Sequence, residues 1–268
     1  MWDLGKNNVL GVLVDAVDYG AAVHKVISAA RDRRGYAVTA LAVHGIMTGV
    51  QDAEHRYRLN QFDLVTPDGQ PVRWALNLLH GTHLAERVYG PTLTLAVCAA
   101  AADEGLPVYF YGSRPEVLER LVENLSAQYP GLVVAGAEPS KFRRTTLDEK
   151  AEIARRIRAS GARIVFVGLG CPRQEIFAYE YRDLLGMPVL AVGAAFDYHA
   201  GLLDEPPAWI QRSGLQWLYR LVQEPSRLWR RYLLLNPTFL TLLALQAFHL
   251  WRPGTRDADA PAYDVLYG

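Results

Sequence analysis

Seven short apolar runs alternate with segments of helical periodicity along this chain, and that alternation limits the folds it can adopt. The runs are NVLGVLV (8–14), AVTALAV (37–43), FDLVTP (62–67), PVYFYG (107–112), LVVAG (132–136), RIVFVG (163–168) and PVLAVG (188–193). The segment LDEKAEIARRIRAS (147–160) places its apolar residues near helical spacing, opposite a charged face. Strands separated by helices form βαβ units, so we expect an α/β fold with a mostly parallel sheet and helices on both faces.

The composition narrows the possible functions. A chain of 268 residues with 50% hydrophobic content can bury one large domain, or one domain with an appendage. Its 28 basic and 28 acidic side chains cancel, so no overall field attracts nucleic acid. Cys98 and Cys171 form no disulfide framework and lack metal-ligand spacing. The N-terminus has no basic region followed by a long apolar stretch, so we expect a cytoplasmic protein without a signal peptide.

The stretch LVTPDGQPVRW (64–74) places Asp68 and Gly69 at the tip of an apolar run. Asp-Gly is a common turn dipeptide, and a turn is one interpretation of this pair. The other is catalytic, because α/β sheets hold their ligands at the carboxyl ends of strands, where an acid can act as a base. The residues alone leave both interpretations open.

Two strand-to-helix junctions have the composition of anion-binding sites. One runs through Gly112, the expected N-cap Ser113, and Arg114. The other contains Gly168, Gly170, Pro172 and Arg173. Glycines let the backbone approach a ligand, and the free N–H groups of a helix start favour phosphate. The alternative is that these glycines and prolines only mark the starts and ends of helices. Neither junction matches the GxGxxG or P-loop pattern. Two such junctions in one sheet nevertheless favour a diphosphate ligand.

The last third of the chain is basic and rich in tryptophan. Between Trp209 and Arg252 there is one acid, Glu224, and four of the six tryptophans. The candidate membrane or acceptor arginines are Arg212, Arg220, Arg227, Arg230 and Arg231. The apolar run that follows is interrupted by Asn236 and Pro237, so we expect it not to span a bilayer. The composition fits a helix pair at the membrane interface, or a helical hairpin packed on the sheet or in a subunit interface.

Six motifs, in order, resemble the WecG/TagA/CpsF glycosyltransferase family. They are LVTPDGQPVRWALNLLHG, ERVYGPTL, VYFYGSRPEVLE, IVFVGLGCPRQE, VGAAFDYHAG and WIQRSGLQWLYRLVQEPSRLWRRYL, and the match runs from about the second strand to Tyr232. The resemblance implies a Rossmann-like domain (1–205) and a C-terminal membrane-associating helical appendage (206–252). Residues 253–268 are rich in Pro, Asp and Ala, and this composition predicts a disordered tail. The resemblance also implies transfer of a sugar, N-acetylmannosamine in the best-known members, from a UDP-sugar to a polyprenyl-diphosphate-linked acceptor.

The same resemblance places the enzyme in the biosynthesis of bacterial surface polymers, such as wall teichoic acid or exopolysaccharide. It implies a cytoplasmic protein held peripherally at the inner membrane surface. No metal and no cofactor are expected. The donor sugar, the acceptor and the linkage stay open, and so does the oligomeric state, with a homo-oligomer as one possibility.

The resemblance also implies roles for particular residues. Asp68 matches the aspartate that acts as general base, and Arg87 in ERVYG matches the arginine on the departing diphosphate. An ion pair with Glu86 or another surface acid is the alternative for Arg87. Gln174 matches a glutamine near the donor, beside Glu175, which is expected to hold a sugar or ribose hydroxyl. We expect Cys171 to be a small buried filler, since no partnered base is evident.

One stretch departs from the family pattern. Members carry a Thr-x-Asn pair at the end of the second strand, and here Ala40 and Ala42 occupy those positions, followed by His44. Three explanations are open: His44 supplies the lost hydrogen bonds, the donor differs, or activity is reduced. A lone histidine beside an apolar strand is by default structural.

Three functions therefore compete. The first is a metal-independent inverting glycosyltransferase. The second is a catalytically impaired nucleotide-sugar-binding or scaffold subunit of a polysaccharide assembly complex, which the retained Asp68, Arg87 and Gln174 disfavour. The third is a nicotinamide-dependent oxidoreductase, which the missing GxGxxG disfavours.

Overall fold

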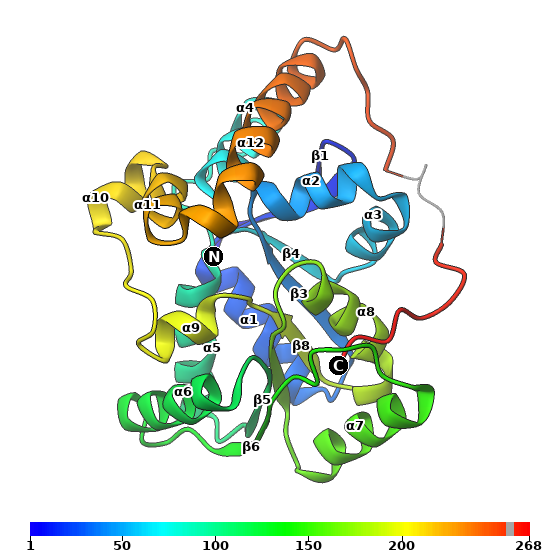
Figure 1. Cartoon of the computed structure of the whole chain (residues 1–268), viewed down its shortest axis with the longest axis vertical. Coiled ribbons are helices and arrows are strands. Elements are labelled where there is room, and N and C mark those ends of the chain that lie inside the picture. The colour runs from blue at the N-terminus through cyan, green and yellow to red at the C-terminus, as the bar shows by residue number, and fades with distance from the viewer. Residues whose placement is uncertain (256–259) are drawn as a thin grey trace.

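A six-stranded sheet forms the centre of the molecule in the computed structural model, which describes residues 1–255 and 260–268 (Figure 1). The side chains of Ala208, Arg227, Arg230 and Arg231 also lie outside that description. The strands are β3 (Tyr36–Leu41), β4 (Leu64–Pro67), β5 (Val108–Gly112), β6 (Val134–Glu138), β7 (Ile164–Gly168) and β8 (Pro188–Ala191). They lie in the order β4-β3-β8-β7-β5-β6, and every neighbouring pair is parallel. The predicted α/β fold with a parallel sheet is confirmed.

Helices cover both faces of this sheet, as predicted. On one face lie α1 (Tyr19–Arg31), α5 (Gly90–Asp103), α6 (Pro115–Gln128) and α9 (Ala195–His199). On the other lie α2 (Val43–Gln51), α3 (Ala53–Asn60), α4 (Gln70–His80), α7 (Leu147–Ala159) and α8 (Arg173–Leu185). Strand β7 shows the reason: Val165 and Val167 join one apolar core, and Ile164 and Phe166 join the other.

The expected first strand is wrong. The run 8–14 is divided by a turn at Leu10 and Gly11, whose φ angles are 55° and 90°. It contributes to a separate antiparallel hairpin of β1 (Asp3–Val9) and β2 (Val12–Val17). Asp15 of β2 is 2% exposed and accepts a 2.8 Å hydrogen bond from Val65 N, so the hairpin covers the β4 edge of the sheet.

Three helices follow the core: α10 (Ala208–Ser213), α11 (Gln216–Gln223) and α12 (Pro225–Ala247). Pro237 lies inside α12 and does not end it, contrary to the expected interruption. Phe239 and Leu243 anchor the helix in the core beside α2 and α4, which is why it continues past the proline (Figure 1). Among the described residues, no helix combines the length and the apolar character needed to cross a bilayer.

The last residues were expected to be disordered, but residues 260–268 lie against α7 and α8 near the C-terminus marked in Figure 1. Asp264 forms a 2.6 Å ion pair with Lys150, and the backbone N–H groups of Val265 and Leu266 donate to the Glu180 carboxylate. Residues 256–259 of the expected tail lie outside the described residues. The division into a core, an appendage and a tail stays a prediction.

Removing residues 264–268 tests how much this contact stabilises the fold. The deletion removes Asp264, which pairs with Lys150 at 2.6 Å, and the two backbone N–H groups that donate to the Glu180 carboxylate. Each such hydrogen bond contributes about 0.5–1.5 kcal/mol to stability. We expect Tm to fall by roughly 5 °C. Tyr263→Ala, at a side chain that is 82% exposed, is the matched control, and an unchanged Tm in the deletion would show that the tail is not anchored.

Candidate active site

Asp68 lies at the carboxyl end of the sheet, directly after β4. Pro67 pairs with Leu41 of β3, and Asp68 N continues the ladder with a 3.1 Å hydrogen bond to Leu41 O. Gly69 then caps α4, and a Cβ built on it would lie 3.5 Å from Ala42. The turn and the displayed carboxylate are therefore the same feature.

The Asp68 carboxylate is partly buried among opposite charges. Its pKa is raised to about 6, because the effect of burial exceeds the lowering by Arg87, Arg220 and the Gly90 N–H. Gly90 begins α5 and must be small, since a Cβ there would lie 3.3 Å from Ala40 Cβ and 3.6 Å from Asp68 Oδ2. A carboxyl group with this pKa is largely ionised at neutral pH and can still accept a proton.

Arg87 is 7% exposed and lies beside the same carboxylate. Its guanidinium group stacks 4.3 Å over the Tyr89 ring and donates to Gln211 Oε1 at 3.3 Å. Within residues 1–255 and 260–268, no ion pair joins Arg87 to Glu86, which was the alternative interpretation. A buried guanidinium without a carboxylate partner in direct contact is suited to an anionic ligand.

The C-terminal helices cover this end of the sheet. Gln216 of α11 donates to Tyr89 Oη at 2.8 Å, and Gln70 of α4 donates to the Gln211 backbone oxygen at 3.3 Å. Arg220 lies 6.0 Å over the Tyr198 ring and close enough to Asp68 to lower its pKa. Of the candidate membrane arginines, Arg220 thus faces the site and Arg212 is exposed. The side chains of Arg227, Arg230 and Arg231 lie outside the described residues.

The two expected anion junctions lie side by side. Gly112 and Gly168 are paired in register where the connections of β5 and β7 leave the sheet in opposite directions, which is a topological switch point. Gly112 has a φ of 111°, and a Cβ there would lie 3.0 Å from the Gly168 carbonyl. Only glycine permits this close approach at Gly112, and a Cβ on Gly168 would lie 2.5 Å from the Phe196 ring.

The helix starts at these junctions differ from the expected ones. The N-cap of α6 is Arg114, and Ser113 adopts a left-handed φ of 60°, so the expected serine cap is wrong. Pro115 begins the helix without a donor to cap, which explains why no side chain is needed there. Arg114 and Arg173 are exposed at the rim, beside the half-buried Gly170.

Gln174 holds the second junction together. Its Oε1 accepts from Gly170 N at 3.1 Å, and its Nε2 donates to Glu175 Oε1 at 2.9 Å. Thr39 of β3 donates to the same Glu175 oxygen at 3.2 Å. Burial raises the pKa of Glu175 and lowers that of the neighbouring His55 to about 4. Among the described residues, His55, Cys171 and Glu175 form the cluster that could hold a metal ion.

The two alanines that replace the family's polar pair line the site. Ala40 lies against Gly90, and Ala42 is exposed beside Gly69. His44 is half-buried in the first turn of α2, which begins one residue after Ala42. The departure from the family pattern therefore lies next to Asp68, and not at a distant surface.

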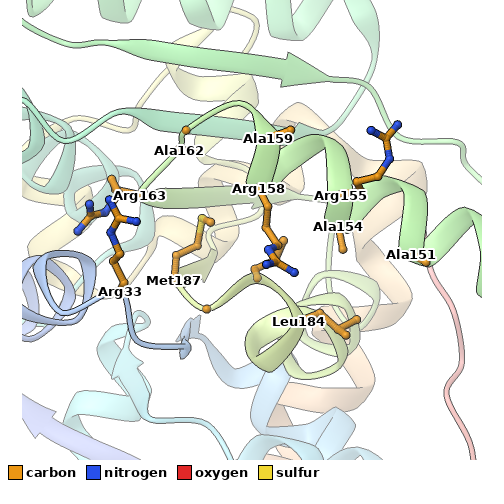
Figure 2. Close-up of a pocket in the computed structure, with 13 residues that line it drawn as sticks. Arg33, Ala151, Ala154, Arg155, Arg158, Ala159, Ala162, Arg163, Leu184 and Met187 are labelled. Atoms are coloured by element: carbon orange, nitrogen blue, oxygen red, sulfur yellow. The ribbon is translucent and has the colours of Figure 1, made fainter.

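A large pocket of about 810 Å³ lies at the opposite end of the sheet and plays no part in this site (Figure 2). Figure 2 shows Arg33, Arg158 and Arg163 around an apolar floor that includes Met187. These residues flank the amino ends of β7 and β8. Because parallel sheets bind ligands at the carboxyl ends, the candidate active site is the Asp68 end.

Sequence reasoning did not single out Tyr89, Tyr198, Gln211 and Gln216. Each stands inside a motif already noted, in ERVYG, FDYHAG or WIQRSGLQW. These residues could have been noticed because each carries a polar group near apolar residues of the sequence. A buried tyrosine or glutamine requires a hydrogen-bond partner.

The sequence comparisons identify the family of this chain. The model of the glycosyl transferase WecG/TagA/CpsF family matches residues 7–253. An N-acetylglucosaminyldiphosphoundecaprenol N-acetyl-beta-D-mannosaminyltransferase of Bacillus spizizenii is 32% identical over 193 residues, 72% of this chain and 72% of its own. The protein with that activity from Bacillus subtilis is 29% identical over 195 residues, 72% of this chain and 73% of its own. The chain therefore belongs to the WecG/TagA/CpsF family of glycosyl transferases.

Proposed function

We propose that this protein is an inverting glycosyltransferase that moves a sugar from a UDP-sugar to a polyprenyl-diphosphate-linked acceptor in bacterial surface-polymer synthesis. The observation that carries the proposal is the Asp68 carboxylate between Gly90 N–H, Arg87 and Arg220 at the carboxyl end of the sheet. The named activity of the Bacillus relatives supports the same acceptor class and an N-acetylmannosamine donor. Incubation with a panel of UDP-sugars and short-chain polyprenyl-diphosphate acceptors, followed by mass spectrometry, tests it.

Asp68 acts as the general base. The acceptor hydroxyl attacks the anomeric carbon, its proton passes to the Asp68 carboxylate, and the bond from the anomeric carbon to the UDP oxygen breaks. A hydroxyl group is a poor nucleophile at neutral pH, so removal of its proton in the transition state lowers the barrier. Attack from the face opposite the leaving group inverts the anomeric centre.

Arg87 and Arg220 stabilise the charge that grows on the departing diphosphate. Both guanidinium groups lie near Asp68, and the paired Gly112 and Gly168 junctions offer backbone N–H groups to phosphate oxygens. We propose that these groups suffice without a catalytic metal. The donor loop is completed by Gln174, which holds Gly170 in place.

The C-terminal helices bring the site to the membrane. Trp209, Val222, Leu233, Leu234 and Leu240 are between 60% and 75% exposed on α10–α12. Exposed apolar side chains together with arginines suit the boundary between headgroups and acyl chains. We propose peripheral attachment through this surface, which would place the lipid diphosphate beside Arg220.

The second candidate function is a nucleotide-sugar-binding subunit without turnover. Ala40 and Ala42 favour it, since both lie at the site and supply no hydrogen bond. Both candidates bind UDP, and only the enzyme forms product, so the product assay separates them.

Substitution of Asp68 tests the general base. Asp68→Asn should lower kcat by roughly two to four orders of magnitude and leave UDP-sugar affinity nearly unchanged. In the wild type, kcat/KM should rise with pH through about 6 and then level off, because the raised pKa leaves the carboxyl protonated below that pH. Asp183→Asn, at a side chain that is 83% exposed, is the control. Normal turnover in Asp68→Asn would contradict the general-base role and leave Asp68 with a structural role in the turn.

Substitution of Arg87 tests the leaving-group role. Arg87→Lys should lower kcat by roughly 10²–10³-fold, because lysine cannot reproduce the planar fork that binds a diphosphate. Arg34→Lys is matched, since Arg34 also stacks on a tyrosine, Tyr36, at 4.8 Å. The assay is run with EDTA and again with added Mg²⁺. A fall in Tm with kcat intact would make Arg87 structural, and activity that depends on Mg²⁺ would contradict the metal-free mechanism.

Substitution of the exposed apolar side chains tests the membrane surface. Replacement of Val222, Leu233 and Leu234 by serine should prevent sedimentation with anionic vesicles and leave UDP binding unchanged, since these side chains are 65–75% exposed. Leu184→Ser, 45% exposed at the opposite end of the sheet, is the control. A triple variant that still sediments would leave the helical hairpin packed on the sheet as the better interpretation.

A further inference from the structure

A second polar cluster borders the Gly168–Gln174 loop and includes Glu175, for which the family resemblance implied a contact with a sugar or ribose hydroxyl. His55 belongs to the first turns of α3, Cys171 to the loop after β7, and Glu175 to the first turn of α8. One ligand atom from each lies within 4.8 Å of the other two. Three separate elements therefore bring an imidazole, a thiol and a carboxylate together.

The cluster contains buried polar atoms without partners. His55 is 1% exposed, and neither of its ring nitrogens has a hydrogen-bond partner. Glu175 is also 1% exposed, and its Oε2 has none, although Thr39 and Gln174 both donate to its Oε1. Buried polar atoms are nearly always paired in folded proteins, so these orphaned atoms indicate a missing ligand.

The donor set has the chemistry of a zinc site. Thiolate, imidazole and carboxylate ligands suit Zn²⁺, while Mg²⁺ and Ca²⁺ prefer oxygen ligands alone. One Zn²⁺ with an ionised Cys171, an ionised Glu175 and a neutral His55 has no net charge, which is the least costly state in a buried setting. In a tetrahedral centre the ligand atoms stand roughly 3.4–3.7 Å apart, so small side-chain adjustments would close the cluster.

We propose that His55, Cys171 and Glu175 bind one Zn²⁺ ion. Thr39 and Gln174 hold one oxygen of Glu175 and so direct the other, Oε2, toward the metal, as outer partners commonly do for ligating carboxylates. Cys171 is half-buried within the loop, and water or a ligand would supply the fourth ligand of a tetrahedral Zn²⁺.

The metal would connect the donor loop to α3. The loop ends in the Gly170–Gln174 hydrogen bond that shapes the second anion junction, and α3 packs on α8 behind it. A bound Zn²⁺ would therefore order the donor loop from the side remote from Asp68. It takes no part in the proton transfer assigned to Asp68, so zinc binding and sugar transfer can be tested separately.

The test uses the full chain, freed of metal, and titrated with Co²⁺ alone. We expect one equivalent to bind, with a thiolate-to-cobalt charge-transfer band and a rise in Tm, and Zn²⁺ should displace the Co²⁺ and its band. Cys171→Ala should abolish the band, and His55→Ala should weaken Co²⁺ binding by more than the roughly 10–100-fold that loss of an outer partner costs. Glu175→Gln keeps an oxygen for Thr39 and removes the charge, so it should weaken binding in a protein that folds.

Cys98→Ala is the matched control, because Cys98 is the other cysteine of the chain and lies in the core on the opposite face of the sheet. It should keep the band. Co²⁺ binding without a thiolate band, a band that survives in Cys171→Ala, or no binding with an unchanged Tm would each overturn the proposal. The last result would mean that ordered water satisfies the cluster.

Discussion

The buried charge of Asp68 is the constraint on which the rest of this end of the molecule depends. A carboxylate withdrawn from water must be compensated, and here the compensation comes from Gly90 N–H, Arg87 and Arg220. Each partner imposes a structural condition. Gly90 must lack a side chain for α5 to begin against Ala40. Arg220 belongs to α11 and lies more than 150 residues beyond Asp68 in the sequence. The resulting pKa of about 6 suits proton transfer near neutrality, which is the role proposed for Asp68.

This requirement gives the C-terminal helices two surfaces with different properties. Their inner side is polar near the site, with Gln211 on Arg87 and Gln216 on Tyr89, and apolar where Phe239 and Leu243 of α12 enter the core. Their outer side carries exposed apolar residues such as Val222 and Leu233. Surface helices that bury an apolar stripe ordinarily expose a polar face. The apolar outer side is the feature on which the proposed membrane attachment rests.

Sequence reasoning predicted the parallel sheet, the two facing glycine junctions and the place of Asp68, because these follow from local apolar runs and turn residues. It failed where contacts between residues far apart in the sequence determine the structure. The run 8–14 reads as one strand until Asp15 is seen to cover the β4 edge. Pro237 was expected to break the helix, but the burial of Phe239 in the core holds the helix together. The tail was expected to be disordered, but its contacts with Lys150 and Glu180 hold it in place. The tyrosines and glutamines around Arg87 were overlooked for the same reason, since their partners come from separate motifs.

Ala40 and Ala42, at and just after the end of β3, bear on the pKa of Asp68. Polar side chains at the positions of Ala40 and Ala42 would offer hydrogen bonds close to the Asp68 carboxylate and favour its ionised form. Methyl groups offer none, so burial is left as the largest influence on the Asp68 pKa. A higher pKa makes the carboxylate a stronger base, and it also lowers the fraction that is ionised at a given pH. In the proposed mechanism, the departure from the family pattern would therefore affect the base itself, as well as the space left for the sugar.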